Sequence, residues 1–181
     1  MPRRQSQRGA SDRAASGDPR LPSKHSLGLA TVPWLIGLLA FVADQVTKSL
    51  VVQAAGNQPD TVIKVFTPFL AFVYVRNTGV AFSLFSQQGV LALLVPVVII
   101  GVVITFVRYL PPNVLLLRFS MGLILGGALS NLIDRLRQGY VVDFIEAHAG
   151  EHVWPLFNVA DSCIVVGVAL LAWYLVFRAE T

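Results

Sequence analysis

The chain has 181 residues, of which 55% are apolar and only 13% are charged, and its formal net charge at pH 7 is +4. Ordinary soluble domains carry about 25% charged residues, so this composition excludes an ordinary soluble domain and indicates a membrane protein. The single cysteine, Cys163, excludes an intramolecular disulfide.

The first 26 residues form a basic leader in which Ser, Pro and Gly separate the charges. This composition predicts a disordered tail whose role is topological. It does not favour nucleic-acid binding, because no aromatic residue interrupts the basic ones. The late start of the first apolar run argues against a cleaved export signal. We therefore divide the chain into a disordered basic cytoplasmic tail, residues 1–26, and a membrane domain, residues 27–181.

Four apolar segments follow, at residues 27–43, 89–107, 119–133 and 162–177. A membrane-spanning helix needs roughly 20 apolar residues, and the segments reach that length once the polar residues at their ends are included. The sequence therefore predicts an all-α membrane protein with four transmembrane helices.

Basic residues fix the expected orientation. The tail is basic, Arg108 and Arg118 bracket the short connection between the second and third spans, and Arg178 follows the fourth. Basic flanks stay in the cytoplasm, so we expect both termini there and residues 44–88 and 134–161 on the outer face.

The outer segments contain extended patterns. Residues 61–66 and 69–75 are rich in β-branched and aromatic residues and predict two short strands, and residues 140–145 are extended by pattern. They predict a small extracytoplasmic β element and loop platform, although a hairpin that only caps the bundle explains the pattern equally well. The turn-forming residues 77–83 follow directly.

Two groups of charges lie near the outer span ends. Asp44 and Lys48 have the favourable i, i+4 order, which fits either an interfacial ion pair or a substrate-binding role. The spacing of Asn131, Asp134 and Arg135 places them on one helix face. We expect Asp134 and Arg135 to form a structural network that fixes the helix end.

Asp143 and Asp161 have no basic residue close by in sequence. If the fold brings them together, one carboxyl keeps its proton while the other ionises. Such a pair activates water as a general base and protonates the substrate as a general acid. The alternative is two unrelated, solvated acids.

Two other functions fit parts of the sequence. The pattern His148-Ala149-Gly150-Glu151-His152 matches a zinc-protease signature, but Gly150 and Pro155 make the required helix doubtful, so a solvated loop is favoured. An ion-conducting protein would place acids near mid-span, whereas these acids cluster at one edge.

Five motifs in fixed order together resemble the bacterial lipoprotein signal peptidase (signal peptidase II) family over about residues 27–177. They are Asp44-Gln45-x-x-Lys48, Asn77-Thr78-Gly79-x-Ala81-Phe82-Ser83, Asn131-Leu132-Ile133-Asp134-Arg135, Gly139-x-Val141-Val142-Asp143-Phe144 and Phe157-Asn158-x-Ala160-Asp161. Ser130 and Val80 stand where the family commonly has smaller residues.

The resemblance implies a multi-pass aspartic endopeptidase of the bacterial inner membrane, without metal or cofactor, with its site at the outer face. Its implied substrate is a diacylglyceryl-modified prolipoprotein, cleaved just before the lipidated cysteine, and globomycin is the implied inhibitor. Asp143 and Asp161 are the implied catalytic pair. The residues implied to bind substrate or support the site are Asp44, Lys48, Asn77, Gly79, Ala81, Phe82, Asn131, Asp134, Arg135, Asn158 and Ala160.

Overall fold

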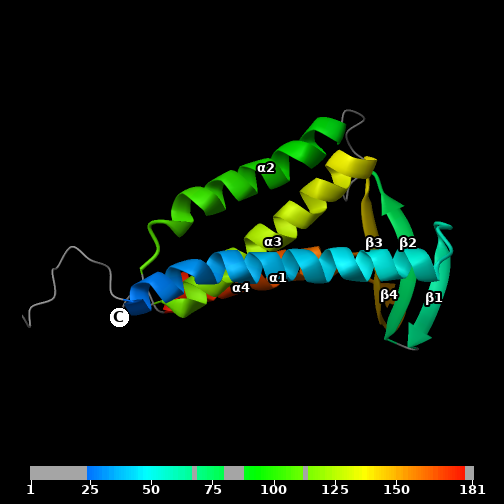
Figure 1. The fold of residues 1–181 in the computed structure, drawn as a ribbon. Coiled ribbons are helices and arrows are strands. Elements are labelled where there is room, and N and C mark those ends of the chain that lie inside the picture. Colours follow the sequence, from blue (N-terminus) through cyan, green and yellow to red (C-terminus); the bar gives the residue numbers. More distant parts are fainter. Residues whose placement is uncertain (1–23, 67–68, 80–87, 112–113, 178–181) are drawn as a thin grey trace, which may run out of the picture.

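The computed structural model describes residues 24–66, 69–79, 88–111 and 114–177. In these ranges four long helices form a bundle, and a small sheet lies across one end, here called the sheet end (Figure 1). The helices are α1 (Lys24–Ala54), α2 (Gln88–Val107), α3 (Leu115–Gln138) and α4 (Val159–Phe177). Each is long and apolar enough to cross a membrane, which confirms the four predicted spans.

The helices are longer than the apolar segments. α1 continues eleven residues beyond Ala43, and α3 continues five residues beyond Ile133. Both extensions contain charged residues, such as Lys48 and Asp134, that are buried against each other rather than solvated. A search for apolar residues stops at such charges, although their mutual pairing lets the helix continue.

α3 lies at the centre of the bundle because its glycines permit close contact on two sides. A Cβ atom on Gly122 would lie 2.7 Å from the backbone oxygen of Pro33 in α1, and one on Gly126 would meet the backbone of Gly37. On the other side, a Cβ atom on Gly127 would meet the backbone oxygen of Ala160 in α4. Small residues at such positions are typical of closely packed membrane helices.

The outer helices expose apolar side chains that fit a lipid environment. Leu38 in α1, Val98 in α2 and Val165 in α4 are 58%, 60% and 67% exposed. In water such a surface would be costly, whereas lipid tails solvate it. The chain is therefore a multi-pass membrane protein.

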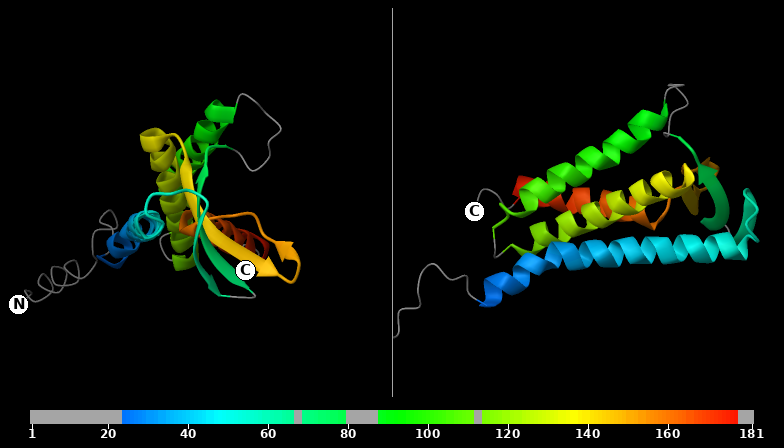
Figure 2. Two further views of the ribbon diagram at one scale, coloured as in Figure 1. Left: turned by 90° about the vertical axis from the view of Figure 1, so that its right-hand side faces the viewer. Right: turned by 45° about the horizontal axis from the view of Figure 1, so that its top comes forward.

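The sheet is antiparallel with the order β1-β2-β3-β4, and Figure 2 shows its strands crossing the helix ends. Its strands are β1 (Thr61–Phe66), β2 (Leu70–Asn77), β3 (Val141–Ala149) and β4 (His152–Val153). The three extended segments predicted from sequence are confirmed, and β4 was not predicted. Tyr74, Val142 and Phe144 pack with Ala55 at the end of α1, which anchors the sheet on the bundle.

Several predictions fall outside the described residues. They concern Val80, Ala81 and Phe82 after β2, residues 1–23 of the basic tail, and Arg178. The described part of α1 begins at Lys24, three residues before the predicted start of the membrane domain.

Candidate active site

Asp143 is positioned by the turn from α3 into β3. Gly139 takes the left-handed conformation with φ +80°, and its N–H donates to the backbone oxygen of Arg135 at 3.0 Å. This glycine cap ends the helix and lets the chain turn directly into the strand. Asp143 then lies opposite Val75 in β2 and is 3% exposed.

Asp161 is positioned by the first turn of α4. The backbone N–H of Asp161 donates to Asn158 Oδ1 at 2.9 Å, and the backbone N–H of Asn158 donates to Asp161 Oδ2 at 3.2 Å. This reciprocal pair is a capping box, in which the cap residue and the third helical residue satisfy each other's free N–H groups. The positive end of the helix dipole also favours an anion at this position.

Amide side chains connect the two aspartates. Asn158 Nδ2 donates to Asp143 Oδ1 at 2.7 Å, so Asn158 contacts both acids. Asn77 Nδ2 donates to Asp143 Oδ2 at 2.7 Å, and Asn131 Nδ2 donates to Asp161 Oδ1 at 2.8 Å. Both carboxylates line one cavity of about 550 Å³, here called the active-site cavity.

Burial raises the pKa of Asp143 to about 6, from an ordinary value of 3.8. The hydrogen bond from Asn77 opposes this rise, the negative charge of Asp161 adds to it, and the hydrogen bond from Asn158 and the charge of Lys48 oppose it. Desolvation disfavours the charged carboxylate, and a like charge nearby acts in the same direction. Burial and the neighbouring acid therefore favour the protonated form of Asp143 up to about pH 6.

A buried cluster of Asp44, Lys48 and Asp134 lies on the α1 side of the two aspartates, Asp143 and Asp161. Lys48 Nζ lies 2.6 Å from Asp44 Oδ2 and 2.7 Å from Asp134 Oδ2, and it donates to Asn131 Oδ1 at 2.9 Å. Asn131 in turn holds Asp161. Removing the lysine would leave two buried carboxylates without a cation, a change that typically costs about 3–5 kcal/mol.

The expected Asp134–Arg135 network is wrong. Asp134 pairs with Lys48 and accepts a hydrogen bond from Gln45, whereas Arg135 Nη1 donates to the backbone oxygen of Asn131 at 3.3 Å. The side chains of Asp134 and Arg135 also line different cavities. Asn131 and Arg135 line the active-site cavity, and Asp134 faces the other side of α3. Asn131 and Asp134 still meet at Lys48 Nζ, whereas Asp134 and Arg135 are consecutive residues and therefore point about 100° apart around the helix.

Ala160 and Gly79 contribute to the site through hydrogen bonds from their backbone N–H groups. The N–H of Ala160 donates to Asp44 Oδ1 at 2.8 Å, and Ala160 is fully buried against Gly127. The N–H of Gly79 donates to Asn77 Oδ1 at 3.1 Å, which fixes the amide that contacts Asp143.

Gln45 and Ser130 form buried and part-buried polar contacts that the sequence motifs did not indicate. Ser130 Oγ donates to Asp44 Oδ2 at 2.7 Å, and Gln45 Nε2 donates to Ser130 Oγ at 2.9 Å and to Asp134 Oδ1 at 2.7 Å. By sequence, Ser130 differs from the family pattern only in being larger than the residue that is common there. Its position one helical turn before Asp134 was the available signal.

The zinc-protease alternative needs His148 and His152 on one helix, and the structure places them in strands. His148 and His152 lie in the β3–β4 hairpin, where His148 is opposite Val153 and Ala149 is opposite His152, so the required helix is absent from this segment. His148 instead contacts Glu146, with 2.8 Å between Nε2 and Oε1. Among the described residues, no cluster of three His, Cys, Asp or Glu side chains is suited to a metal.

Comparison with known proteins identifies the family. The family model described as signal peptidase (SPase) II matches residues 36–177. The chain belongs to this family. A lipoprotein signal peptidase of Moorella thermoacetica is 42% identical over 145 residues, covering 80% of this chain and 93% of the relative. That of Aquifex aeolicus is 44% identical over 149 residues, covering 79% and 86%.

Solved structures agree with this assignment. A bacterial membrane enzyme superposes with a TM-score of 0.72 at 29% identity, covering 81% of this chain and 94% of that one. A second gives a TM-score of 0.70 at 30% identity, covering 80% and 87%. As a member of the signal peptidase II family, the protein is a membrane peptidase and therefore a hydrolase.

Proposed function

We propose that this signal peptidase is an aspartic endopeptidase that removes signal peptides from diacylglyceryl-modified lipoprotein precursors. One observation carries the proposal: Asp143 and Asp161 line a single cavity and are joined by Asn158. The names of the relatives, lipoprotein signal peptidases, support the substrate class.

In the proposed reaction the dyad acts as one unit that carries one proton. The ionised carboxylate removes a proton from a water molecule as its oxygen attacks the scissile carbonyl carbon, and the protonated carboxyl donates its proton to the carbonyl oxygen. A proton then passes to the peptide nitrogen as the C–N bond breaks, which leaves a carboxylic acid and an amine. The aspartates form no covalent intermediate.

The walls of the active-site cavity suit an apolar helical substrate. Leu91, Val95 and Ile99 line it from α2, and Ile164 lines it from α4. In this proposal the signal peptide enters from the membrane between α2 and α4, while the diacylglyceryl chains stay in lipid. Lipid attachment then fixes the depth of the bond before the modified cysteine, and the sheet lies over it as a platform.

The proposed location is the bacterial inner membrane, with both termini in the cytoplasm and the sheet end outside. The distribution of basic residues supports this orientation. A globomycin-type inhibitor is expected to occupy the active-site cavity.

Cleavage of a defined precursor by the purified full chain tests the proposal. A diacylglyceryl-modified precursor is compared with the same precursor lacking the lipid, each with and without a metal chelator. We expect cleavage before the cysteine of the lipidated precursor alone, unaffected by chelator. Equal cleavage of both precursors would refute the lipid requirement, and loss of activity with chelator would refute the metal-free mechanism.

A further inference from the structure

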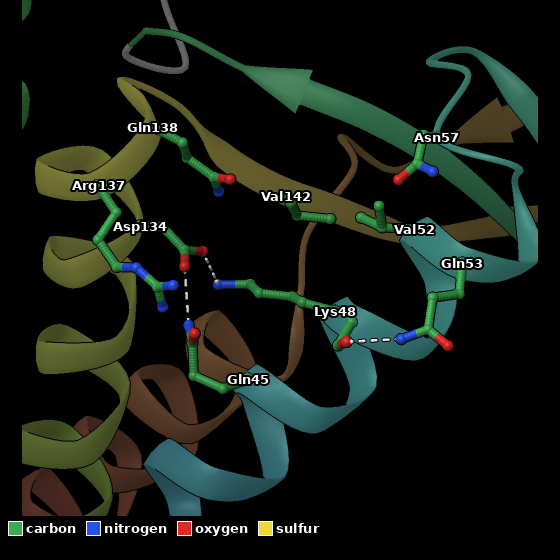
Figure 3. Close-up of a pocket in the computed structure, with 10 residues that line it drawn as sticks. Gln45, Lys48, Val52, Gln53, Asn57, Asp134, Arg137, Gln138 and Val142 are labelled. Atoms are coloured by element: carbon green, nitrogen blue, oxygen red, sulfur yellow. Dashed lines mark hydrogen bonds and ion pairs between the residues drawn. The ribbon is translucent and has the colours of Figure 1, made fainter.

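A chain of hydrogen bonds runs from α1 through α3 to the first turn of α4. Figure 3 shows where it begins, in a cavity of about 470 Å³ between α1, α3 and β3, where Gln45 and Lys48 of α1 reach across to Asp134 of α3. From Gln45 the chain passes to Ser130 Oγ on α3 at 2.9 Å. Ser130 Oγ then donates to Asp44 Oδ2 on α1 at 2.7 Å.

Asp44 caps α4 although it belongs to another helix. The first N–H groups of a helix have no partner within it and need acceptors from elsewhere. In α4, Asn158 accepts the N–H of Asp161, whereas Asp44 Oδ1 accepts the N–H of Ala160 at 2.8 Å. A carboxylate at this position also interacts favourably with the helix dipole. The placement of Asp44 therefore determines the placement of the backbone next to Asp161.

Ser130 is the donor best suited to hold the carboxylate of Asp44 in one place. Asp44 Oδ2 lies 2.6 Å from Lys48 Nζ and 2.7 Å from Ser130 Oγ. The lysine ammonium sits on a flexible four-carbon stem and is shared with Asp134 and Asn131. A serine hydroxyl has a single side-chain torsion above the backbone, so α3 itself sets where it lies. Ser130 therefore fixes the carboxylate relative to α3.

Gln45 directs the hydroxyl of Ser130 toward Asp44. Because the amide nitrogen of Gln45 donates to Ser130 Oγ, the hydroxyl accepts on that side and its own hydrogen is left for the carboxylate. Ser130 and Asp44 are fully buried. Water does not compete for a bond in such a place, and leaving the bond unmade is costly.

Ser120 shows what a buried serine of α3 does without such a role. It is also fully buried, and its hydroxyl donates to the backbone oxygen of Leu117 in the same helix at 2.9 Å. Local bonds of this kind are ordinary for a serine within a helix. The hydroxyl of Ser130 instead connects two residues of α1. Ser120 is therefore a matched reference for Ser130.

We propose that Ser130 is a positioning residue for Asp161: its hydroxyl fixes Asp44, and Asp44 fixes the first turn of α4 through the N–H of Ala160. Ser130 is not among the described residues that line the active-site cavity, so it acts through Asp44 and not on the substrate. This inference rests on the proposed catalytic role of Asp161.

Single-turnover cleavage of the lipidated precursor, with the full-length enzyme in excess, tests the proposal. The rate constant at saturating enzyme does not depend on the fraction of enzyme that is active. Ser130→Ala should lower it about tenfold or more, because a small displacement of a catalytic group is costly. The enzyme concentration for half-maximal rate should change by less than about twofold, because the cavity walls that receive the peptide are unaltered. Ser120→Ala should match the wild type in both.

Hydrogen exchange at the Ala160 amide gives a readout that does not depend on catalysis. Ser130→Ala should speed this exchange about fivefold, the equivalent of one weakened hydrogen bond. Ser120→Ala removes an equally buried hydroxyl and should leave the exchange at Ala160 unchanged.

Gln45→Met tests the same chain from its half-buried end and decides the matter by the same criteria if Ser130→Ala does not fold. It should lower the rate constant about threefold or more and speed exchange in the first turn of α4. Gln53→Met is the control, because the amide of Gln53 donates to Ser49 of its own helix. It should leave both measurements unchanged.

Asp161→Asn in the same assay separates this inference from the proposed function. Normal turnover by Asp161→Asn would refute the catalytic role on which the inference rests. If Asp161→Asn is inactive, a wild-type rate constant for Ser130→Ala, or equal slowing by Ser130→Ala and Ser120→Ala, would overturn the positioning role alone.

Discussion

At the residue scale, the protonation of Asp143 determines how the site responds to pH. Its pKa rises from an ordinary 3.8 to about 6 in the folded protein, mainly through burial. The folded state therefore holds this proton more tightly than the unfolded state does. The associated stabilisation is complete below about pH 4 and is lost as pH rises through about 6. The same deprotonation removes the shared proton that the proposed mechanism needs.

Asn77→Ala tests this protonation directly. The substitution removes a donor 2.7 Å from Asp143 Oδ2 that stabilises the ionised carboxylate, so the pKa of Asp143 should rise. We expect the alkaline decline of kcat/KM, near pH 6 in the wild type, to move to higher pH. Gln58→Ala, an exposed amide in the loop before β1, serves as the control. A decline that stayed in place or moved to lower pH would argue against this role for Asn77.

Sequence singled out most of the polar residues that the structure brings together around the two aspartates, but not all of their contacts. Asp143 and Asp161 were singled out because they lacked a nearby cation in sequence, and Asn158 was implied by a motif. The pairing of Lys48 with Asp134 joins residues 86 positions apart on different helices, so neighbouring positions could not reveal it. The adjacent Arg135 was the obvious partner by sequence and was wrong.

At the element scale, glycines set the distance between α3 and its neighbours and thereby the geometry of the ion cluster. Gly126 packs against Gly37, and a Cβ atom at Gly126 would also lie 2.8 Å from the Cβ atom of Ala40. The cluster of Lys48 and Asp134 lies further along the same pair of helices. Helix separation and site geometry are therefore linked.

Gly126→Ala is expected to destabilise the protein by about 2 kcal/mol, because backbone atoms on α1 cannot move aside as a flexible side chain can. Thermal unfolding in detergent should show a lower Tm. Gly101→Ala is the matched control, because a Cβ atom there meets nothing within 4 Å and alanine favours a helix. Equal Tm values for the two variants would contradict the close α1–α3 packing.

Helix boundaries were the least predictable feature of the elements. The apolar pattern identified all four spans, but it ended α1 and α3 at their first charged residues. β4 is only two residues long, His152–Val153, and its pairing with β3 depends on a turn at Gly150 with φ +63°. Such a short strand has no pattern that sequence can reveal.

At the scale of the whole molecule, α2 leaves space for a substrate. Its Val103 and Val107 pack with Met121 and Leu125 of α3, whereas its half nearer the sheet lines the active-site cavity. The four helices were predictable from composition, but this asymmetric packing was not, because α2 is apolar on every side. Only the contacts show which part of it packs and which part borders the cavity.

Val95→Trp tests entry between α2 and α4. Val95 is 56% exposed and lines the active-site cavity, so a larger side chain should obstruct the signal peptide and raise KM roughly tenfold with little change in kcat. Val98→Trp places the same side chain on α2 at a 60% exposed position outside the cavity lining and should not raise KM. Similar KM values for both variants would contradict this route.

The central claim is that Asp143 and Asp161 together activate water. The most direct measurement is the single-turnover cleavage rate of Asp143→Asn and of Asp161→Asn on a lipidated precursor, with the Tm recorded to confirm folding. Asparagine preserves size but cannot exchange the proton, so each variant should lose on the order of 10³-fold or more in rate. Normal turnover by either folded variant would show that the pair is not the catalyst.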